Sequence, residues 1–442
     1  MTTEAGPDYP VTEPIPVLSS RPGLRDMFAA LRFFNYRLYL IAQFFANTGG
    51  WMQRVAMDWL VLELTGNVAL VGLTVTLQFA PSILLGAWAG VISDRANRRW
   101  VLVTTQSVGT VVNGVLAVLV LTGAVQAWNV FLAAALTGCS MAIDGPSRSA
   151  FVTEMVGSRY LRNAITFNAS IFHLGGLLGP AISGALIVVI GSGWSIALNA
   201  CTSLIAVCAL LLMRSRELHP THRQGAARGQ IREALGYAIR KPTILWPIVL
   251  LAFVSTFGMN LPVLLTASAS ETYHTGAAGY GLYSSLAALG AFLGALVQTR
   301  RMGIRLRDIV IACGAFGLVV ALAGVVPWYG LFLVALVGVG FSRLTFAISA
   351  ESLVQLSTNL GIRGRVASLY FTVVTGGQAL GGVVMGWIAE NWGATAAFAL
   401  GGGVPALAAV VVAVLLARRH RLRVAVDFRR PRNLVRIVRA AG

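Results

Sequence analysis

Long apolar runs, separated by short polar connections, make up most of the chain. A helix needs about 20 mainly apolar residues to cross a membrane, and twelve runs approach or exceed that length. They cover approximately residues 38–64, 69–92, 100–122, 127–147, 163–190, 194–213, 244–269, 279–298, 309–326, 328–350, 366–389 and 394–417. Glycines recur within these runs, as is typical of helices that pack closely in a membrane. The pattern predicts an all-α polytopic membrane protein with twelve transmembrane helices.

Composition excludes a soluble protein. The 442 residues are 56% hydrophobic and only 11% charged, whereas a soluble domain carries about a quarter charged residues because its surface faces water. The sequence contains no glycine-rich phosphate loop, catalytic triad or metal-ligand spacing. We therefore predict that the protein is not an enzyme and holds no cofactor and no metal.

The basic residues are distributed asymmetrically. There are 34 Lys and Arg against 16 Asp and Glu, and all of the basic residues except Arg54 and Arg343 lie near the two ends of the chain or in alternate connections. The remaining connections contain no Lys or Arg; they are 65–68, 123–126, 191–193, 270–278, 327 and 390–393. Cytoplasmic loops retain positive charge, so we predict that both termini are cytoplasmic. Nucleic-acid binding is excluded, because it requires a basic stripe on one folded face.

The longest basic connection divides the apolar runs into six plus six. It contains the amphipathic segment IREALGYAIRK, which predicts a helix lying at the lipid headgroups. The basic C-terminal segment is predicted to rest on anionic lipid, so membrane lipids are expected partners. The predicted organisation is an N-terminal tail (1–32), a six-helix bundle (33–213), a central loop (214–243), a second bundle (244–417) and a basic tail (418–442).

The two halves of the chain are weakly similar to each other. GVISDRANRR follows the second run, and GALVQTRR follows the eighth, about 200 residues later; duplication of this kind is a transporter signature. The first segment resembles the G-x-x-x-D-R-x-x-R-R loop of the major facilitator superfamily. Over residues 33–417, segments such as DGPSRSAFVTEMV and LRNAITFNASIFHLGGLLGPAISG resemble its bacterial branch of enterobactin exporters and drug efflux proteins. This resemblance implies two six-helix bundles around a central cavity, with alternating access.

The resemblance also implies a cytoplasmic gate. In the family this loop locks the cytoplasmic side when the transporter faces outward, and Arg148 is the partner we would choose for the loop aspartate. Asp144 is an alternative partner for Arg148, because the two residues are four apart. Gln298 stands where the second half would carry the aspartate, so a symmetric lock is in doubt. The gate residues are Gly90, Asp94, Arg95, Arg98, Arg99 and Arg148.

Two charged residues lie within the first apolar run. Arg54 and Asp58 are four apart and therefore share a helix face, and a charge at the centre of a membrane helix costs about 2.5–3.5 kcal/mol. One interpretation is a self-neutralising pair that fixes helix packing. The other is that Asp58 carries a proton under the influence of Arg54. Asp144 and His173 are further proton-coupling candidates, although His173 also fits a packed, hydrogen-bonded histidine.

The fifth run carries LGGLLGPAISG. This segment is similar to the Gly-Pro signature of drug–proton antiporters in the superfamily, and its small residues suit close helix approach. The similarity favours export. The residues that carry it are Gly175, Gly179, Pro180 and Gly184.

In the family, helices 1, 4, 7 and 10 line the cavity. Aromatics and amides among aliphatic residues suit an amphiphilic organic molecule, and Arg343 could meet an anionic group or pair with Glu351. The candidate liners are Asn47, Gln53, Phe257, Asn260, Phe341 and Arg343.

These features predict a monomeric, proton-coupled exporter of amphiphilic small molecules in the bacterial cytoplasmic membrane. Its partners would be protons and a substrate such as a drug or a siderophore-like metabolite. Two alternatives remain open at this point. One is a facilitator or importer of a lipid- or amino-acid-like solute. The other is a non-transporting scaffold or sensor with the same fold.

Overall fold

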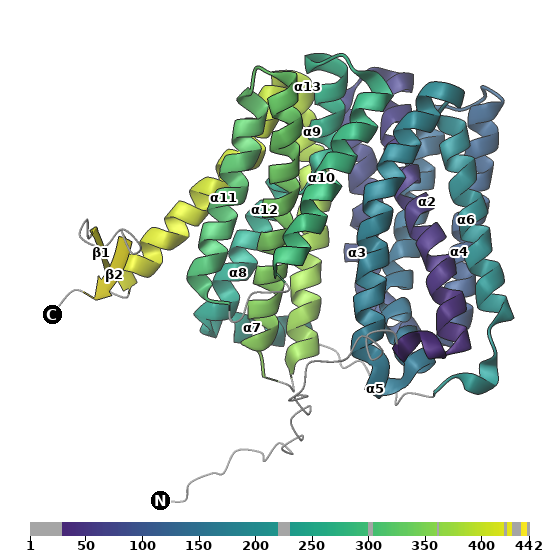
Figure 1. Cartoon of the computed structure of the whole chain (residues 1–442), viewed down its shortest axis with the longest axis horizontal. Helices are drawn as coiled ribbons and strands as arrows, with labels where there is room; N and C mark the ends of the chain where they lie inside the picture. Colours follow the sequence, from purple (N-terminus) through teal and green to yellow (C-terminus); the bar gives the residue numbers. More distant parts are fainter. Residues whose placement is uncertain are drawn as a thin grey trace, which may run out of the picture.

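The computed structural model describes residues 29–219, 230–298, 304–359, 362–419, 422–426 and 435–439. These residues form two helical bundles that stand side by side (Figure 1). The first bundle contains η1 (Ala29–Arg32), α2 (Phe34–Thr65), α3 (Val68–Arg95), α4 (Arg98–Leu121), α5 (Ala127–Ile190) and α6 (Ser192–Leu212).

The second bundle begins after two short elements, η2 (Ser215–Glu217) and α7 (Gln230–Arg240). Its first crossing is interrupted by two wider π-helical turns, η3 and η4. The elements of this bundle are α8 (Pro242–Phe253), η3 (Val254–Gly258), α9 (Leu261–Ala267), η4 (Ser268–Thr272), α10 (Gly276–Gln298), α11 (Leu306–Val325), α12 (Tyr329–Leu356) and α13 (Arg363–Arg419).

The helices account for twelve membrane crossings in the described part of the chain. Ten spans there are long and apolar enough to cross a membrane. The span Arg363–Arg418 has 56 residues and bends at Gly393, whose φ is 80°, so it crosses twice. α2 is less apolar because polar side chains interrupt it, but its 32 residues are also long enough to cross. The predicted all-α fold is confirmed.

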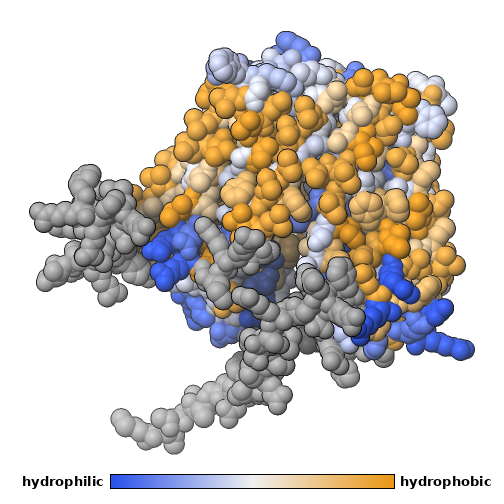
Figure 2. Space-filling model, in the orientation of Figure 1, coloured by the Kyte–Doolittle hydropathy of each residue, from blue (hydrophilic) through white to orange (hydrophobic). Residues whose placement is uncertain are grey.

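The outer surface is suited to lipid. Figure 2 shows a broad hydrophobic band on the visible face, with hydrophilic residues concentrated at its ends. Large apolar side chains are exposed within this band of helices, including Leu84 (75% exposed), Val189 (77%) and Trp88 (70%). A water-facing surface rarely exposes so large a contiguous apolar area. The chain is therefore a multi-pass membrane protein.

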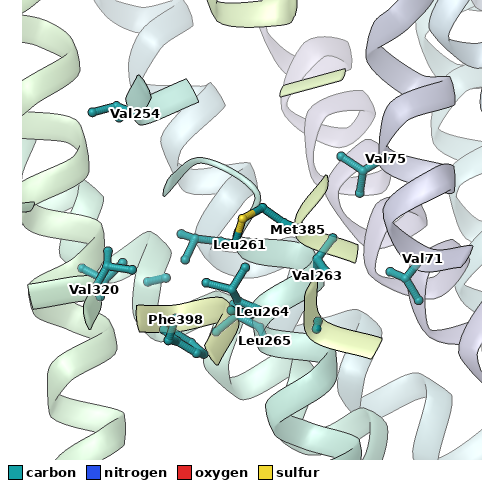
Figure 3. Packing of buried hydrophobic residues seen from close by; sticks show 14 of the residues in the cluster. Val71, Val75, Val254, Leu261, Val263, Leu264, Leu265, Val320, Met385 and Phe398 are labelled. Carbon is teal, nitrogen blue, oxygen red and sulfur yellow. The ribbon is translucent and has the colours of Figure 1, made fainter. Parts of the chain in front are cut away.

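Two seams join the bundles. α3 packs on α13, and α5 packs on α10; the buried cluster between them includes Val71 and Val75 of α3 and Met385 of α13 (Figure 3). Backbones approach closely at both seams. A Cβ atom at Gly72 would lie 2.9 Å from Cα of Gly386, and no side chain fits at that distance.

Short elements also lie outside the bundles. In α7, Ala234 and Ala238 are buried, whereas Leu235 and Ile239 are exposed; Glu233 of this helix pairs with Arg365. Beyond α13, β1 (Leu422–Val426) and β2 (Val435–Arg439) form an antiparallel hairpin. The other residues of the predicted tails, and 220–229 of the central loop, lie outside the described residues.

Candidate functional site

A cavity of about 970 Å³ lies mainly within the first bundle. Helices α2 to α6 supply nearly all of its lining. It extends from Met57 of α2 past Arg148 to Val152 and Leu161 near the arginine-rich end. The second bundle contributes Leu344, Ala347, Ile348, Glu351 and Phe371.

Hydrogen bonds between the bundles hold the opposite, arginine-free end closed. The Val68 N–H donates to Glu390 Oε2 at 2.6 Å, beside the arginine-free connections. Deeper in the seam, Thr76 Oγ1 donates to the carbonyl of Ala379 at 2.7 Å. Because these contacts join α3 to α13, the cavity reaches the arginine-rich end and not the other.

Arg54 lines the cavity without an acidic partner. Its guanidinium carbon lies 4.9 Å from the ring centroid of Trp51 and 5.9 Å from that of Phe79. Its Nη2 donates to the sulfur of Met141 at 3.4 Å. Within the described part of the chain, no carboxylate oxygen lies within 4.0 Å of this guanidinium.

Asp58 is 1% exposed and lies at the contact between the bundles. Tyr280 of α10 donates its hydroxyl to Asp58 Oδ2 at 2.8 Å, and the Tyr280 ring stacks on Trp59 with centroids 6.5 Å apart. The other carboxyl oxygen, Oδ1, is buried and has no hydrogen-bond partner among the described residues. The closure of the arginine-free end therefore includes a membrane-embedded acid.

Arg54 and Asp58 do not form the ion pair that their spacing suggested. They do lie on one helix, four residues apart, but the long Arg54 side chain contacts the aromatic wall of the cavity. The short Asp58 side chain meets Tyr280 instead. Tyr280 was missed in the sequence, because a tyrosine 222 positions from its partner gives no local signal.

Asp144 and Arg148 form an ion pair within the cavity wall. Arg148 Nε donates to Asp144 Oδ2 at 2.6 Å, and Asp144 Oδ1 accepts from Thr105 and Gln106 at 3.1 Å each. Arg148 thus takes the alternative partner, whereas the side chain of Asp94 lies outside the described residues. Asp144 thus accepts from three donors, one of which is its paired arginine.

Of the predicted gate residues, two arginines contact their own bundle. Arg98 forms an ion pair with Glu154 at 2.6 Å. Arg99 donates to the carbonyls of Leu210 and Leu211 at the end of α6, at 2.7 and 2.9 Å. These contacts fasten α4 to α5 and α6. Gly90, Asp94 and Arg95 belong to the last turns of α3, and the Arg95 side chain is exposed.

Gln298, which replaces the motif aspartate in the second half, also makes contacts within its own bundle. Its Nε2 donates to the carbonyl of Thr345 at 3.2 Å and to Ser349 Oγ at 3.1 Å. The amide therefore fastens α10 to α12.

The Gly-Pro segment of α5 lies against two other helices. A Cβ atom at Gly179 would lie 2.7 Å from the carbonyl oxygen of Thr48 in α2, and Gly175 meets the same turn. A Cβ atom at Gly184 would lie 2.8 Å from Cα of Gly281 in α10. The segment, with its Pro180, thus shapes the α5–α10 seam.

His173, which precedes this segment, lines the cavity. Its ring lies 5.8 Å from that of Phe172, and Arg343 of α12 lies within electrostatic reach of it. The histidine therefore faces the space between the two bundles.

Two of the six predicted liners, Asn47 and Gln53, line the cavity. Gln53 donates to Asn113 Oδ1 at 2.5 Å and accepts from Asn199 Nδ2 at 2.6 Å. These bonds tie α2 to α4 and α6. Asn47 accepts from Gln43 at 2.9 Å.

The other four predicted liners, Phe257, Asn260, Phe341 and Arg343, are not among the residues that line this cavity. The reason is that the second bundle contributes little to the wall. Asn260 is buried and donates to the carbonyl of Thr256 at 2.9 Å. No ion pair joins Arg343 to Glu351 in the described structure; Glu351 accepts from Gln355 at 2.9 Å.

Several liners escaped the sequence analysis. Gln78 and Asn168 each present a buried side-chain atom without a described partner, Nε2 and Oδ1 respectively. Trp51 and Phe172 add an aromatic pair with centroids 5.7 Å apart. An amide residue inside an apolar run is the sequence feature that could have identified Gln78 and Asn168, because a buried amide needs a hydrogen-bond partner or a ligand.

The profile of the transmembrane secretion effector family matches residues 26–432. The chain belongs to this family. It is thus a transporter of the major facilitator superfamily rather than an enzyme, as predicted. The arginine-rich loop and the two bundles are the features by which the sequence resembled that superfamily.

Among curated relatives, this chain is 27% identical to the multidrug efflux pump Tap of Mycolicibacterium fortuitum; the match covers 87% of this chain and 96% of Tap. It is 23% identical to the enterobactin exporter EntS of Escherichia coli K12, over 87% and 92%. The match to the staphyloferrin A transporter of Staphylococcus aureus is 26% identical but spans only 35% of this chain and 39% of that protein.

A solved structure with the same fold is a bacterial homologue of the human lysosomal transporter Spinster, in an inward-facing, unoccupied conformation. The TM-score is 0.61 at 18% identity, with 87% of this chain and 96% of that one covered. The likeness shows the fold that the two bundles form.

Proposed function

We propose that this secretion-effector family member is a proton-coupled exporter, an antiporter of amphiphilic small molecules such as drugs or a siderophore-like metabolite. The observation that carries the proposal is Asp58, a membrane-embedded acid that accepts a hydrogen bond from Tyr280 across the closed seam. A proton carrier must change its surroundings when the two halves move, and a group at their contact does so. Efflux by Tap and enterobactin export by EntS favour the outward direction.

The proposed cycle links Asp58 to closure of the arginine-free end. Opening that end separates Tyr280 from Asp58 and exposes the acid to the side where protons are plentiful. A proton bound to Oδ1 displaces no hydrogen bond of the closed state, because this oxygen has no described partner. Substrate enters the cavity from the arginine-rich end. At that end, Asp94 with Arg95, Arg98 and Arg99 is the proposed gate for the opposite state.

A transport assay with purified full-length protein tests this function. Inverted proteoliposomes are loaded with buffer at low or neutral pH and offered ethidium, tetracycline and enterobactin. We expect at least one compound to accumulate against its gradient only when the lumen is acidic. Uptake that stops at equal substrate concentrations inside and outside, with or without a pH gradient, would identify a facilitator. If none of the three compounds moved, transport of amphiphilic small molecules would be contradicted.

The proposed orientation places both termini in the cytoplasm of a bacterium and the arginine-free end outside. The protein is proposed to act as a monomer, with α7 and the basic tail at anionic headgroups. Alkaline phosphatase, active only outside the membrane, is expected to give no signal when fused after Gly442 and a strong one when inserted at Gly123, in an arginine-free connection. The reverse pattern would invert the topology.

A further inference from the structure

Arg54 is a partly buried membrane cation that forms no ion pair among the described residues. Asp58 lies within electrostatic reach of it on the same helix, but this carboxylate accepts its hydrogen bond from Tyr280. The other arginine in the cavity lining, Arg148, is neutralised by Asp144 at 2.6 Å. Among the described residues, Arg54 has only the sulfur of Met141 as a hydrogen-bond acceptor, and a thioether accepts weakly. Since an unpaired charge in the membrane is costly, a cation kept in a cavity of about 970 Å³ points to an anion that enters from outside the chain.

The contacts of Arg54 suit the binding of a planar anion. Ring faces of Trp51 and Phe79 lie 4.9 and 5.9 Å from the guanidinium carbon, and cation–π contacts hold the group in place. A guanidinium donates through the N–H groups at its edge, which match the two oxygens of a carboxylate. The aromatic contacts therefore position the cation without satisfying its donors.

The walls near Arg54 suit the body of the same molecule. Trp51 and Phe172 form an edge-to-face aromatic pair, and the amide residues Gln78 and Asn168 also line the cavity. Apolar surface with a few polar groups is typical of sites for small organic ligands.

We infer that Arg54 binds the anionic group of the substrate, a carboxylate or similar organic anion whose aromatic or apolar body lies against Trp51 and Phe172. The inference rests on the proposed function only in taking the cavity as the substrate site. The remaining charged liner, Glu351, lies on the α12 wall of the cavity. It would disfavour an anion near that wall and leave Arg54 as the anion site.

A series of probes with one body and three charges tests the inference. Binding of 1-naphthoate (anionic), 1-naphthamide (neutral) and 1-naphthylmethylammonium (cationic) is measured by calorimetry with the full-length protein in lipid nanodiscs, and empty nanodiscs give the background. We expect naphthoate to bind about tenfold or more tightly than the ammonium compound, as a charge-assisted bidentate contact allows. Arg54→Gln should remove this preference and leave naphthamide binding unchanged.

Two further variants keep the test decisive. Arg54→Lys retains the charge but not the planar donor edge, so its preference for naphthoate should be intermediate between those of the parent protein and Arg54→Gln. If Arg54→Gln fails to fold, Arg54→Lys still tests the role of the guanidinium. Arg343→Gln removes a membrane arginine outside the cavity lining and should reduce the preference much less than Arg54→Gln does. A cation preference, absence of naphthoate binding at millimolar concentration, or equal effects of Arg54→Gln and Arg343→Gln would overturn the inference. No pH gradient is applied, so a failure of proton coupling leaves this result unaffected.

Discussion

Asp58→Asn is expected to abolish accumulation of substrate against its gradient while sparing exchange at equal concentrations on both sides. Asparagine keeps an oxygen that can accept from Tyr280, so the closed seam should still form, but it cannot release a proton. Uphill transport needs net proton movement, whereas exchange does not. The measurement is uptake and counterflow in proteoliposomes, with whichever of ethidium, tetracycline or enterobactin the parent protein transports.

Glu63→Gln is the matched control for Asp58→Asn. Glu63 lies on the same helix and has exposed surface, and it accepts from Trp59 Nε1 at 2.6 Å. Glutamine keeps an oxygen that can accept from Trp59, so the stacking of Trp59 on Tyr280 should remain. This change removes a carboxylate from α2 but leaves Asp58 intact, and uphill transport should persist. If Asp58→Asn concentrates substrate as well as the parent protein does, Asp58 is structural. The proton site would then have to be sought at Asp144 or His173.

Gly72→Val is expected to hold the arginine-free end open and to reduce transport at least tenfold. A Cβ atom there would lie 2.9 Å from Cα of Gly386 and 3.0 Å from the carbonyl carbon of Gly382, both backbone atoms that cannot move aside. The clash exists only when α3 and α13 are packed together at this end. Valine should therefore destabilise the closed state, and because alternating access requires that state, the cycle should stop.

Accessibility of a cysteine at Met141 measures this effect. Met141 lines the cavity and is 42% exposed, so Met141→Cys, in a background without the four natural cysteines, should react with an impermeant maleimide added from the arginine-rich side. Gly72→Val should transfer that reactivity to the arginine-free side. Gly114→Val is the control, since no atom lies within 4 Å of a Cβ added there. Unchanged accessibility with full transport in Gly72→Val would show that the seam tolerates separation.

The sequence by itself determined the membrane class, the twelve crossings and the superfamily. These features follow from local requirements: a span must be long and apolar, and the GVISDRANRR loop is one continuous segment. Gly393, for example, marks the bend that divides α13 into two crossings, and the arginine-free connection beside it was visible before any fold was known.

Tertiary structure decided which polar groups meet. Helical spacing places Arg54 and Asp58 on one face, but it does not say that one side chain reaches an aromatic wall and the other reaches Tyr280. Arg148, by contrast, pairs with Asp144 four residues away on its own helix, as their spacing allowed. Such choices depend on side-chain length and on which distant helix packs alongside.

The same reason explains why four predicted liners are not among the residues that line this cavity. Phe257 and Asn260 were expected to line it because the corresponding family helices do, yet the second bundle contributes only a few residues of α12 and α13 in this conformation. How the two bundles tilt against each other depends on their seams, where glycines such as Gly72 and Gly184 allow backbone contact. A pattern of small residues predicts that helices can approach closely; only the folded chain decides which helices do, and therefore which side chains face the cavity.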